Sequence, residues 1–175
     1  KIGLDVVVGS MTAKPGDELR VVFNWANTGN APGTDAKLTL NMPQGLNVRK
    51  ARNGGVVDDA KVLWSLGDVA VGGGGSVEVL LGVSEKFPAG RTEIPILPTI
   101  VVTDKELEGL RPTVLVVNAD PNLVLDCTVD RQEARPGDYL NYVISMVNTG
   151  NAAAEEARIF FDYPEYLDIV SAPDS

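Results

Sequence analysis

The sequence predicts an all-β protein, an antiparallel β-sandwich with one complete unit and the first half of a second. Three observations predict it: an internal repeat, short segments of alternating large apolar residues, and turn-forming residues between those segments. The chain has 18 glycines and 11 prolines among 175 residues, as expected when many short strands are joined by tight turns. No segment carries apolar residues at the 3.6-residue spacing of an amphipathic helix.

The internal repeat has an offset of 121 residues. The segment Lys14–Leu19 recurs as Arg135–Leu140 with only its first and fifth residues changed. The segment Asn27–Ala31 recurs unchanged as Asn148–Ala152. Without any gap, 18 of the 48 positions in Leu4–Ala51 are identical to those 121 residues later. Such a long ungapped match indicates a duplicated domain.

The period sets the domain boundaries. Residues 1–118 form a complete repeat, which we call unit one, and residues 123–175 form an incomplete second repeat, unit two. Residues 119–122 form a short linker, which Pro121 is expected to stiffen.

The strands are predicted from alternation with a period of two. In Glu18–Ala26 the large residues Leu19, Val21, Phe23 and Trp25 share one face, as expected of a half-buried strand. The other strands expected in unit one are Leu4–Val8, Ala36–Asn41, Val62–Leu66, Val77–Val83, Ile94–Thr103 and Thr113–Val117. Those expected in unit two are Leu123–Val129, Tyr139–Val147 and Ala157–Phe161. About seven short strands in one unit favour an immunoglobulin-like sandwich.

The order of the turn motifs resembles a known family. The motifs are Pro15–Leu19, Asn27–Ala31, Pro43–Leu46, Trp64–Gly67 and Gly73–Ser76. They resemble the bacterial and archaeal surface-protein repeat catalogued as domain of unknown function number eleven, which is akin to the CARDB module. The resemblance implies an immunoglobulin-like fold in tandem arrays on secreted or cell-envelope proteins, and no enzymatic activity. Tyr166 replaces Gly45 in unit two, so we expect that turn to differ.

Charge and composition exclude several functions. The net charge of −9 divides into −1 for residues 1–118 and −8 for residues 119–175, which disfavours nucleic acid and anionic membranes as partners. No apolar run is long enough for a membrane helix, so we expect no direct membrane insertion in this segment. The chain lacks histidine, and no residue order indicates a catalytic pair, so we predict no enzymatic activity and no catalytic residue or organic cofactor.

The repeated asparagines and the linker contain the candidate site residues. We interpret Asn27, Asn30, Asn148 and Asn151 as structural turn residues, because asparagine closes tight turns through its side chain. In the linker, Asn118, Asp120 and Asn122 supply oxygens at alternate positions. These suit an interdomain Ca²⁺, which prefers oxygen ligands, although a solvated polar linker is the competing interpretation.

Four further features have structural interpretations. Cys127 aligns with Val6, which predicts a small buried apolar residue. Trp25 and Trp64 are expected in the core, with an exposed platform for carbohydrate as the alternative. Gly72–Gly75 is expected to be a strand-connecting turn, since it lacks the lysine of a phosphate-binding loop. An isopeptide bond between Lys1 and Asn118 is a further hypothesis.

Unit two lacks the strands that would cover its apolar face. Three explanations are open: the sequence is a fragment of a longer array, another molecule donates the missing strands, or unit two packs on unit one.

The functional prediction is a non-catalytic structural or interaction protein. We expect tandem immunoglobulin-like repeats of a secreted or cell-envelope protein from a bacterium or archaeon, acting as a stalk, surface-layer or filament component. Its expected partners are other copies or repeats of the same protein, or other cell-envelope proteins. The alternative is an extracellular binding module for carbohydrate or a protein partner.

Overall fold

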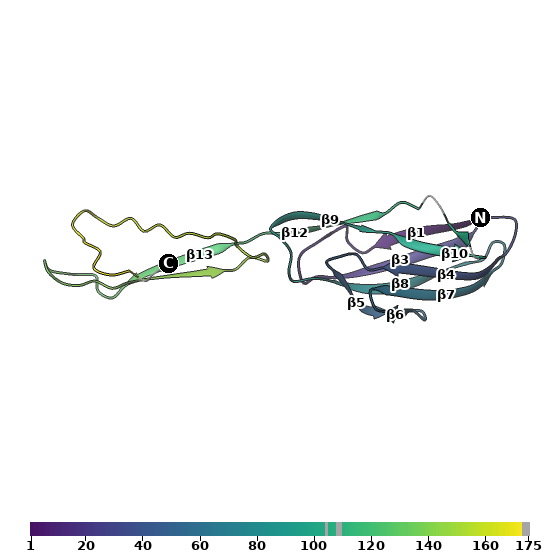
Figure 1. Ribbon diagram of the computed structural model, residues 1–175, viewed down its shortest axis with the longest axis horizontal. Coiled ribbons are helices and arrows are strands. Elements are labelled where there is room, and N and C mark those ends of the chain that lie inside the picture. The colour runs from purple at the N-terminus through teal and green to yellow at the C-terminus, as the bar shows by residue number, and fades with distance from the viewer. Residues whose placement is uncertain (104, 108–109, 173–175) are drawn as a thin grey trace.

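The computed structural model describes residues 1–103, 105–107 and 110–172. Residues up to 119 form a β-sandwich, and the chain then continues into a long two-stranded hairpin that extends away from one end of it (Figure 1). All the regular elements of the described residues are strands.

The sandwich contains three sheets, most of whose strands pair antiparallel. The first has the order β1-β3-β8-β5, with β1 Ile2–Val8, β3 Glu18–Asn27, β8 Gly74–Val83 and β5 Leu46–Ala51. The second has the order β11-β10-β4-β7-β6, with β11 Lys105–Glu106, β10 Pro98–Val102, β4 Gly33–Asn41, β7 Lys61–Val69 and β6 Val56–Asp58. The third has the order β2-β12-β9, with β2 Thr12–Ala13, β12 Thr113–Ala119 and β9 Gly90–Ile96. Within it, β2 pairs parallel to β12.

The core of unit one lies between the sheets, where the alternating faces of their strands meet. Leu19, Val21 and Phe23 of β3 are buried, as their alternation predicts. Trp64 of β7 is fully buried and contacts Phe23 edge-on, with ring centroids 5.7 Å apart. Its Nε1 donates to the carbonyl of Arg52 at 2.8 Å, which satisfies the indole. Trp25 is half-buried and packs against a second small cluster around Ile100.

The hairpin of unit two repeats the first hairpin of unit one residue for residue. Its strands are β13, Leu123–Val129, and β14, Tyr142–Asn148. In unit one Ile2 lies opposite Asn27, and in unit two Leu123 lies opposite Asn148, so both partners are shifted by the repeat offset. The duplication seen in the sequence is therefore reproduced in the strand register.

The predicted strand Ala157–Phe161 is wrong, because these residues form no strand. Their counterpart in unit one lies in β4, which is held between β7 and β10. Counterparts of β7 and β10 would fall beyond Ser175. A strand without neighbours leaves its backbone hydrogen-bonding groups without ladder partners, so this segment stays irregular.

The single long strand predicted over Ile94–Thr103 is also wrong. It divides at Leu97 into β9, which pairs with β12, and β10, which pairs with β4. Pro98 has no N–H to donate to a ladder, and the chain passes from one sheet to another there. Side chains still alternate across the break, which explains why the sequence pattern looks continuous.

The glycine-rich segment is only partly a turn. Gly72 has a φ of +76° and closes the turn, but Gly74 and Gly75 belong to β8. A Cβ on Gly75 would lie 2.7 Å from Cζ2 of Trp25, so glycine is needed where the indole covers the strand. The sequence pattern also missed four strands, β2, β5, β6 and β11, most of them very short.

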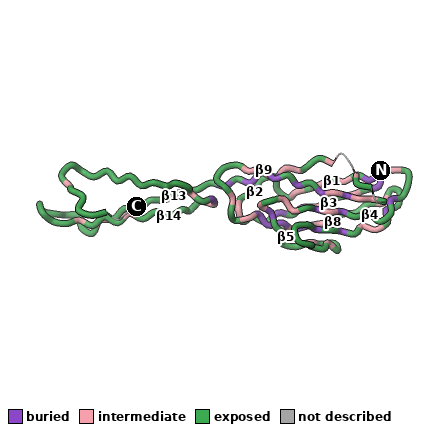
Figure 2. The backbone as a smooth tube through the Cα atoms, viewed as in Figure 1, coloured by how far each residue is buried: buried purple, intermediate pink, exposed green. Residues whose placement is uncertain are grey.

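Cys127 is exposed, which contradicts the prediction that it is buried. Cys127 lies in β13, which pairs with β14 to form a two-stranded sheet. The apolar face of this sheet is uncovered, and Leu125 on it is 56% exposed (Figure 2). Unit two extends away from the sandwich, so unit one does not cover that face (Figure 1). The third explanation for the half unit is therefore wrong. The ring of Tyr142 contacts the ring of Phe161, with 5.2 Å between their centroids, so Phe161 partly covers this apolar face.

The exposure of Cys127 predicts its reactivity. In the native protein its thiol should react fully with a disulfide reagent, because an accessible thiolate is the attacking species. The repeat offers a matched control: Val6→Cys in a Cys127→Ser background places a thiol at the equivalent position of unit one. Val6 is half-buried against the core, so we expect that thiol to react roughly tenfold more slowly or less. Equal rates would show that the hairpin is covered in solution.

An ion-pair network on the first sheet predicts a pH dependence. Glu78 on β8 accepts from Nη2 of Arg20 at 2.7 Å and lies 3.3 Å from Nε of Arg52. The hydrogen bond from Arg20, followed by the charges of both arginines, lowers the pKa of Glu78 against the opposing effect of desolvation. A lowered folded-state pKa stabilises the fold above the unfolded pKa of glutamate, about 4.3, and this stabilisation is lost as pH falls through the folded value.

We therefore expect Glu78→Gln to destabilise unit one at pH 7. The difference from the unmodified protein should shrink as the pH is lowered from about 5 to 3. Urea unfolding followed by tryptophan fluorescence at several pH values measures it. Glu133→Gln, an exposed glutamate of unit two, is the control and should leave the transition unchanged at each pH. A Glu78→Gln effect that is independent of pH would contradict the expectation.

Candidate functional site: the joint between the units

The most elaborate polar arrangement in the described chain is the joint between the two units. The linker leaves β12 after Ala119 and enters β13 at Leu123. The turn Asn148–Ala152, which we call the joint turn, follows β14 and lies beside this linker, since the end of β14 pairs with the start of β13.

The joint turn is shaped by Asn148. Its Nδ2 donates to the carbonyl of Ala152 at 2.7 Å, and its Oδ1 accepts from the N–H of Gly150 at 3.0 Å. Asparagine closes turns in this way because its side chain mimics a backbone amide. The turn therefore has a defined shape before it meets the linker.

Hydrogen bonds from the joint turn reach the backbone of both Asp120 and Asn122 in the linker. At Asn122, the N–H donates to Oδ1 of Asn148 at 3.1 Å and the carbonyl accepts from the N–H of Thr149 at 2.8 Å. At Asp120, the N–H donates to Oδ1 of Asn151 at 2.7 Å and the carbonyl accepts from the N–H of Asn151 at 3.0 Å. The turn thus satisfies both backbone groups of two linker residues.

Asn151 also reaches the last strand of unit one. Its Nδ2 donates to the carbonyl of Asn118, in β12, at 3.4 Å. One side chain therefore connects a turn of unit two, the linker and a strand of unit one.

Gly150 allows the turn and the linker to approach. A Cβ at this position would lie 2.3 Å from the carbonyl oxygen of Asp120 and 2.4 Å from the nitrogen of Asn122. Both neighbours are backbone atoms, which cannot move aside without opening the joint. Any larger residue at position 150 is therefore incompatible with the observed joint.

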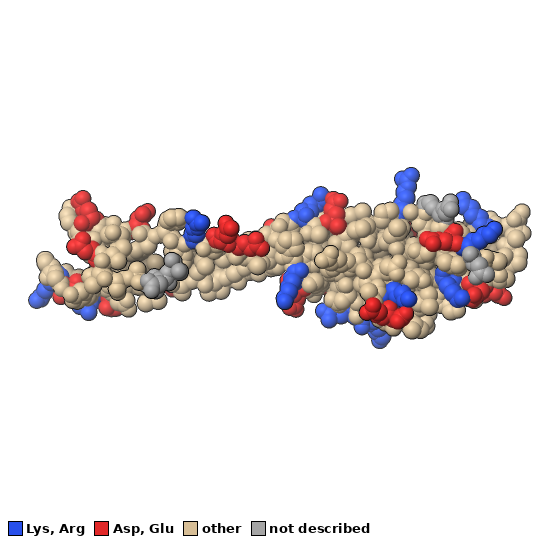
Figure 3. Space-filling model, viewed as in Figure 1, with Lys and Arg blue, Asp and Glu red and all other residues tan. Residues whose placement is uncertain are grey.

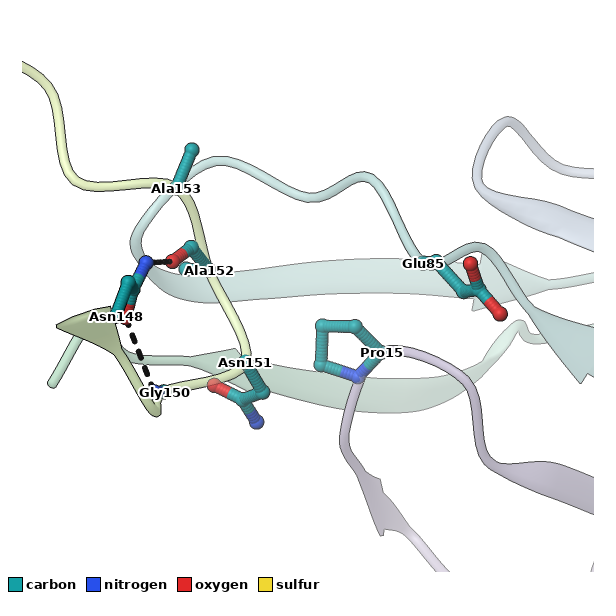
Figure 4. A pocket seen from close by; sticks show the side chains of 7 residues that line it. All are labelled: Pro15, Glu85, Asn148, Gly150, Asn151, Ala152 and Ala153. Carbon is teal, nitrogen blue, oxygen red and sulfur yellow. Dashed lines mark hydrogen bonds between the residues drawn. The ribbon is translucent and has the colours of Figure 1, made fainter.

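An open pocket of about 340 Å³ lies at the joint, between the two units. Unit one contributes Pro15 and Glu85, and the joint turn contributes most of the other side (Figure 4). Ala152, which lines the pocket, is buried, whereas its counterpart Ala31 in unit one is exposed.

The same turn occurs in unit one with a more buried asparagine. Nδ2 of Asn27 donates to the carbonyls of Ala31 at 2.9 Å and Val69 at 3.2 Å, which links the turn to β7. Asn27 is the single buried polar residue among those that the structure describes. Asn30 is exposed beside it.

The structure places the cation candidates Asn118, Asp120 and Asn122 along the joint. Nδ2 of Asn122 donates to Oγ1 of Thr149 at 2.9 Å, so this side chain contributes to the joint itself. In the described ranges no group of three or more histidine, cysteine or acidic side chains is arranged to hold a metal ion. An interdomain Ca²⁺ at these residues stays a prediction.

The positions of Lys1, Asn118 and the two tryptophans test the isopeptide hypothesis and the expected burial of the tryptophans. The carbonyl of Lys1 accepts from the N–H of Thr28 at one end of unit one, while Asn118 lies at the joint end (Figure 1). The isopeptide pair is therefore wrong. Trp64 lies in the core, as expected. Trp25 is half-buried at the edge of the second cluster.

The surface charge follows the division found in the sequence. Figure 3 shows acidic side chains spread over unit two and mixed charges over unit one. In the part of the chain that the structure describes, no helix is long and apolar enough to span a bilayer.

The sequence did not identify the contact between turn and linker, although one signal pointed to it. Since the first and second long strands of a unit pair antiparallel, the end of the second must meet the residues ahead of the first. In unit two those residues are the linker.

Comparisons with known proteins support the fold. No family model matches the chain, and no curated protein matches it. Among solved structures, the major pilin subunit BcpA of Bacillus cereus has a TM-score of 0.56 at 12% identity, over 87% of this chain and 56% of the pilin. The full-length major pilin SpaD of Corynebacterium diphtheriae has a TM-score of 0.48 at 13% identity, over 71% of this chain and 36% of that one.

Other matches differ in function. An exo-β-N-acetylglucosaminidase of Vibrio harveyi has a TM-score of 0.38 at 16% identity, over 67% of this chain and 17% of the enzyme. The chain spans little more than half of the BcpA pilin, and the likeness concerns the fold alone. Together with the described strands, it confirms an all-β fold with an immunoglobulin-like β-sandwich.

Proposed function

We propose that the chain is a non-catalytic structural segment of a secreted or cell-envelope protein, in which tandem immunoglobulin-like units are held end to end. The observation that carries the proposal is the joint. The joint turn bonds both backbone groups of Asp120 and Asn122, so the second unit is attached in a defined orientation. A spacer needs such a joint, because a freely jointed linker would not keep its ends apart.

The fold and the surface support this role. The chain is elongated, with its N-terminus and unit two at opposite ends (Figure 1). The fold is shared with a bacterial pilin subunit, which is compatible with a stalk, surface layer or filament. The proposed partners are further repeats of the same protein or other envelope proteins. The resemblance to the surface-protein repeat number eleven belongs to this proposal.

A second candidate is an extracellular module that binds a protein. The observation that favours it is the exposed apolar face of unit two, where Leu125 and Met146 are 56% and 41% exposed. Exposed apolar patches of this kind mark interaction surfaces. No comparable observation favours carbohydrate binding, because Trp64 is fully buried and Trp25 is half-buried against the core.

Location and shape together test the first proposal. Antibodies raised against this chain should label intact cells of its source at the envelope or on extracellular structures by immunogold electron microscopy. Label confined to the cell interior would overturn the proposal. Small-angle scattering of the purified chain should give the maximum dimension of the extended molecule, and a collapsed particle would show that the joint does not hold the units apart.

A further inference from the structure

The turn Asn27–Ala31 of unit one has the same internal geometry as the joint turn. Nδ2 of Asn27 donates to the carbonyl of Ala31 at 2.9 Å, against 2.7 Å for the equivalent bond in unit two. The N–H of Gly29 donates to Oδ1 of Asn27 at 3.0 Å, the same distance as its equivalent. Unit one therefore carries a preformed copy of the surface that binds the linker.

One backbone contact of this copy is already made as it is at the joint. Lys1 is the counterpart of Asn122, and its carbonyl accepts from the N–H of Thr28 at 2.8 Å, as that of Asn122 does from Thr149. The counterpart of Asn151 is Asn30. Asn30 is exposed, and among the described residues nothing hydrogen-bonds its amide or its backbone.

We propose that Asn30 and its turn are a second linker-binding site, which takes the backbone of an extended segment joined to Lys1. The inference rests on the tandem arrangement proposed above and names the contact through which a preceding unit would be attached. By analogy with the joint, Asn30 would bond both the N–H and the carbonyl of the residue two places ahead of Lys1.

The ligand is defined by its backbone. The bonds of Asn151 go to the backbone of Asp120 and of Asn118, so the site selects an extended chain with a free N–H at one position. A proline at that position cannot donate and would be rejected. Docking would also bury Ala31, as Ala152 is buried at the joint.

The test extends the full chain by four residues ahead of Lys1, copying Asn118–Pro121. Hydrogen exchange measured by NMR should show the backbone amide of Asn30 protected roughly tenfold or more relative to the chain without the extension. A matched extension, Asn-Ala-Pro-Pro, lacks the N–H that the Asn30 side chain would accept, and it should give much less protection. Asn30→Ala in the first extended chain should reduce the protection of residue 30 as well.

Two outcomes would overturn the inference: no added protection with the copied extension, or equal protection with both extensions. The amide of Asn151 in the same spectra separates this failure from failure of the proposed function. If Asn151 is protected and Asn30 is not, the second site does not exist while the joint stands. If neither is protected, the held tandem arrangement also fails.

Discussion

Replacing Phe23 with alanine should lower the free energy of unfolding of unit one by about 3–5 kcal/mol. Phe23 is fully buried and packs edge-on against Trp64, so the truncation removes a large apolar group and leaves a cavity in the core. Urea unfolding followed by tryptophan fluorescence measures the change, because both tryptophans lie in unit one and the signal reports that unit alone.

The repeat supplies the control for this substitution. Ile144 is the counterpart of Phe23 in unit two, where no second sheet covers it. We expect Ile144→Ala to change the tryptophan-detected stability by less than about 0.5 kcal/mol. A comparable loss from both substitutions would mean that unit two packs into the same cooperative core, which the extended hairpin contradicts.

Replacing Gly150 with alanine should open the joint. The added Cβ would lie 2.3 Å from the carbonyl oxygen of Asp120, so the turn and the linker must separate. Spin labels on Cys127 and on a cysteine introduced at exposed Ser76 give the distance distribution between the units. We expect a single narrow distribution in the labelled parent and a broad one in the Gly150→Ala protein.

The asparagines at positions 151 and 30 form a matched pair for the same measurement. Asn151→Ala removes the side-chain bonds to Asp120 and Asn118 but keeps one backbone bond, so we expect a loss of about 1 kcal/mol and partial broadening. Asn30→Ala is the same change in the turn of unit one, where the equivalent bonds are absent, and should leave the distribution unchanged. Broadening by both would show that the effect is not specific to the joint.

Much of the fold followed from local pattern. The alternation in Glu18–Ala26 predicted β3 to within one residue, and the predicted bounds of β13 match those observed. These strands are readable because a buried face requires large residues at every second position. The edge elements were missed since β5 and β6 carry exposed, charged residues, and their pairing depends on the neighbouring strands β8 and β7.

Two of the errors, at Ala157–Phe161 and at Cys127, share one cause, which is the absence of partner strands. The segment Ala157–Phe161 has the residues of a strand but lacks neighbours, and Cys127 has the position of a buried residue but lacks a second sheet. The repeat predicted what each residue would do in a complete unit. The sequence marks the asparagines as turn residues, whereas the contact of the joint turn with the linker depends on the pairing of β13 with β14, which a residue list does not display.

The strand order has a mechanical consequence for a chain pulled from its ends. Tension along the molecule would enter unit one through β1 and leave through β12, and it would enter unit two through β13. Each of these strands is paired along seven residues with an antiparallel neighbour, β3, β9 and β14 respectively. A load directed along such a strand shears all its pairs at once instead of peeling them one by one. The joint turn lies where the load enters β13, so its bonds to Asp120 would yield first and let the linker straighten before any of the three ladders slips.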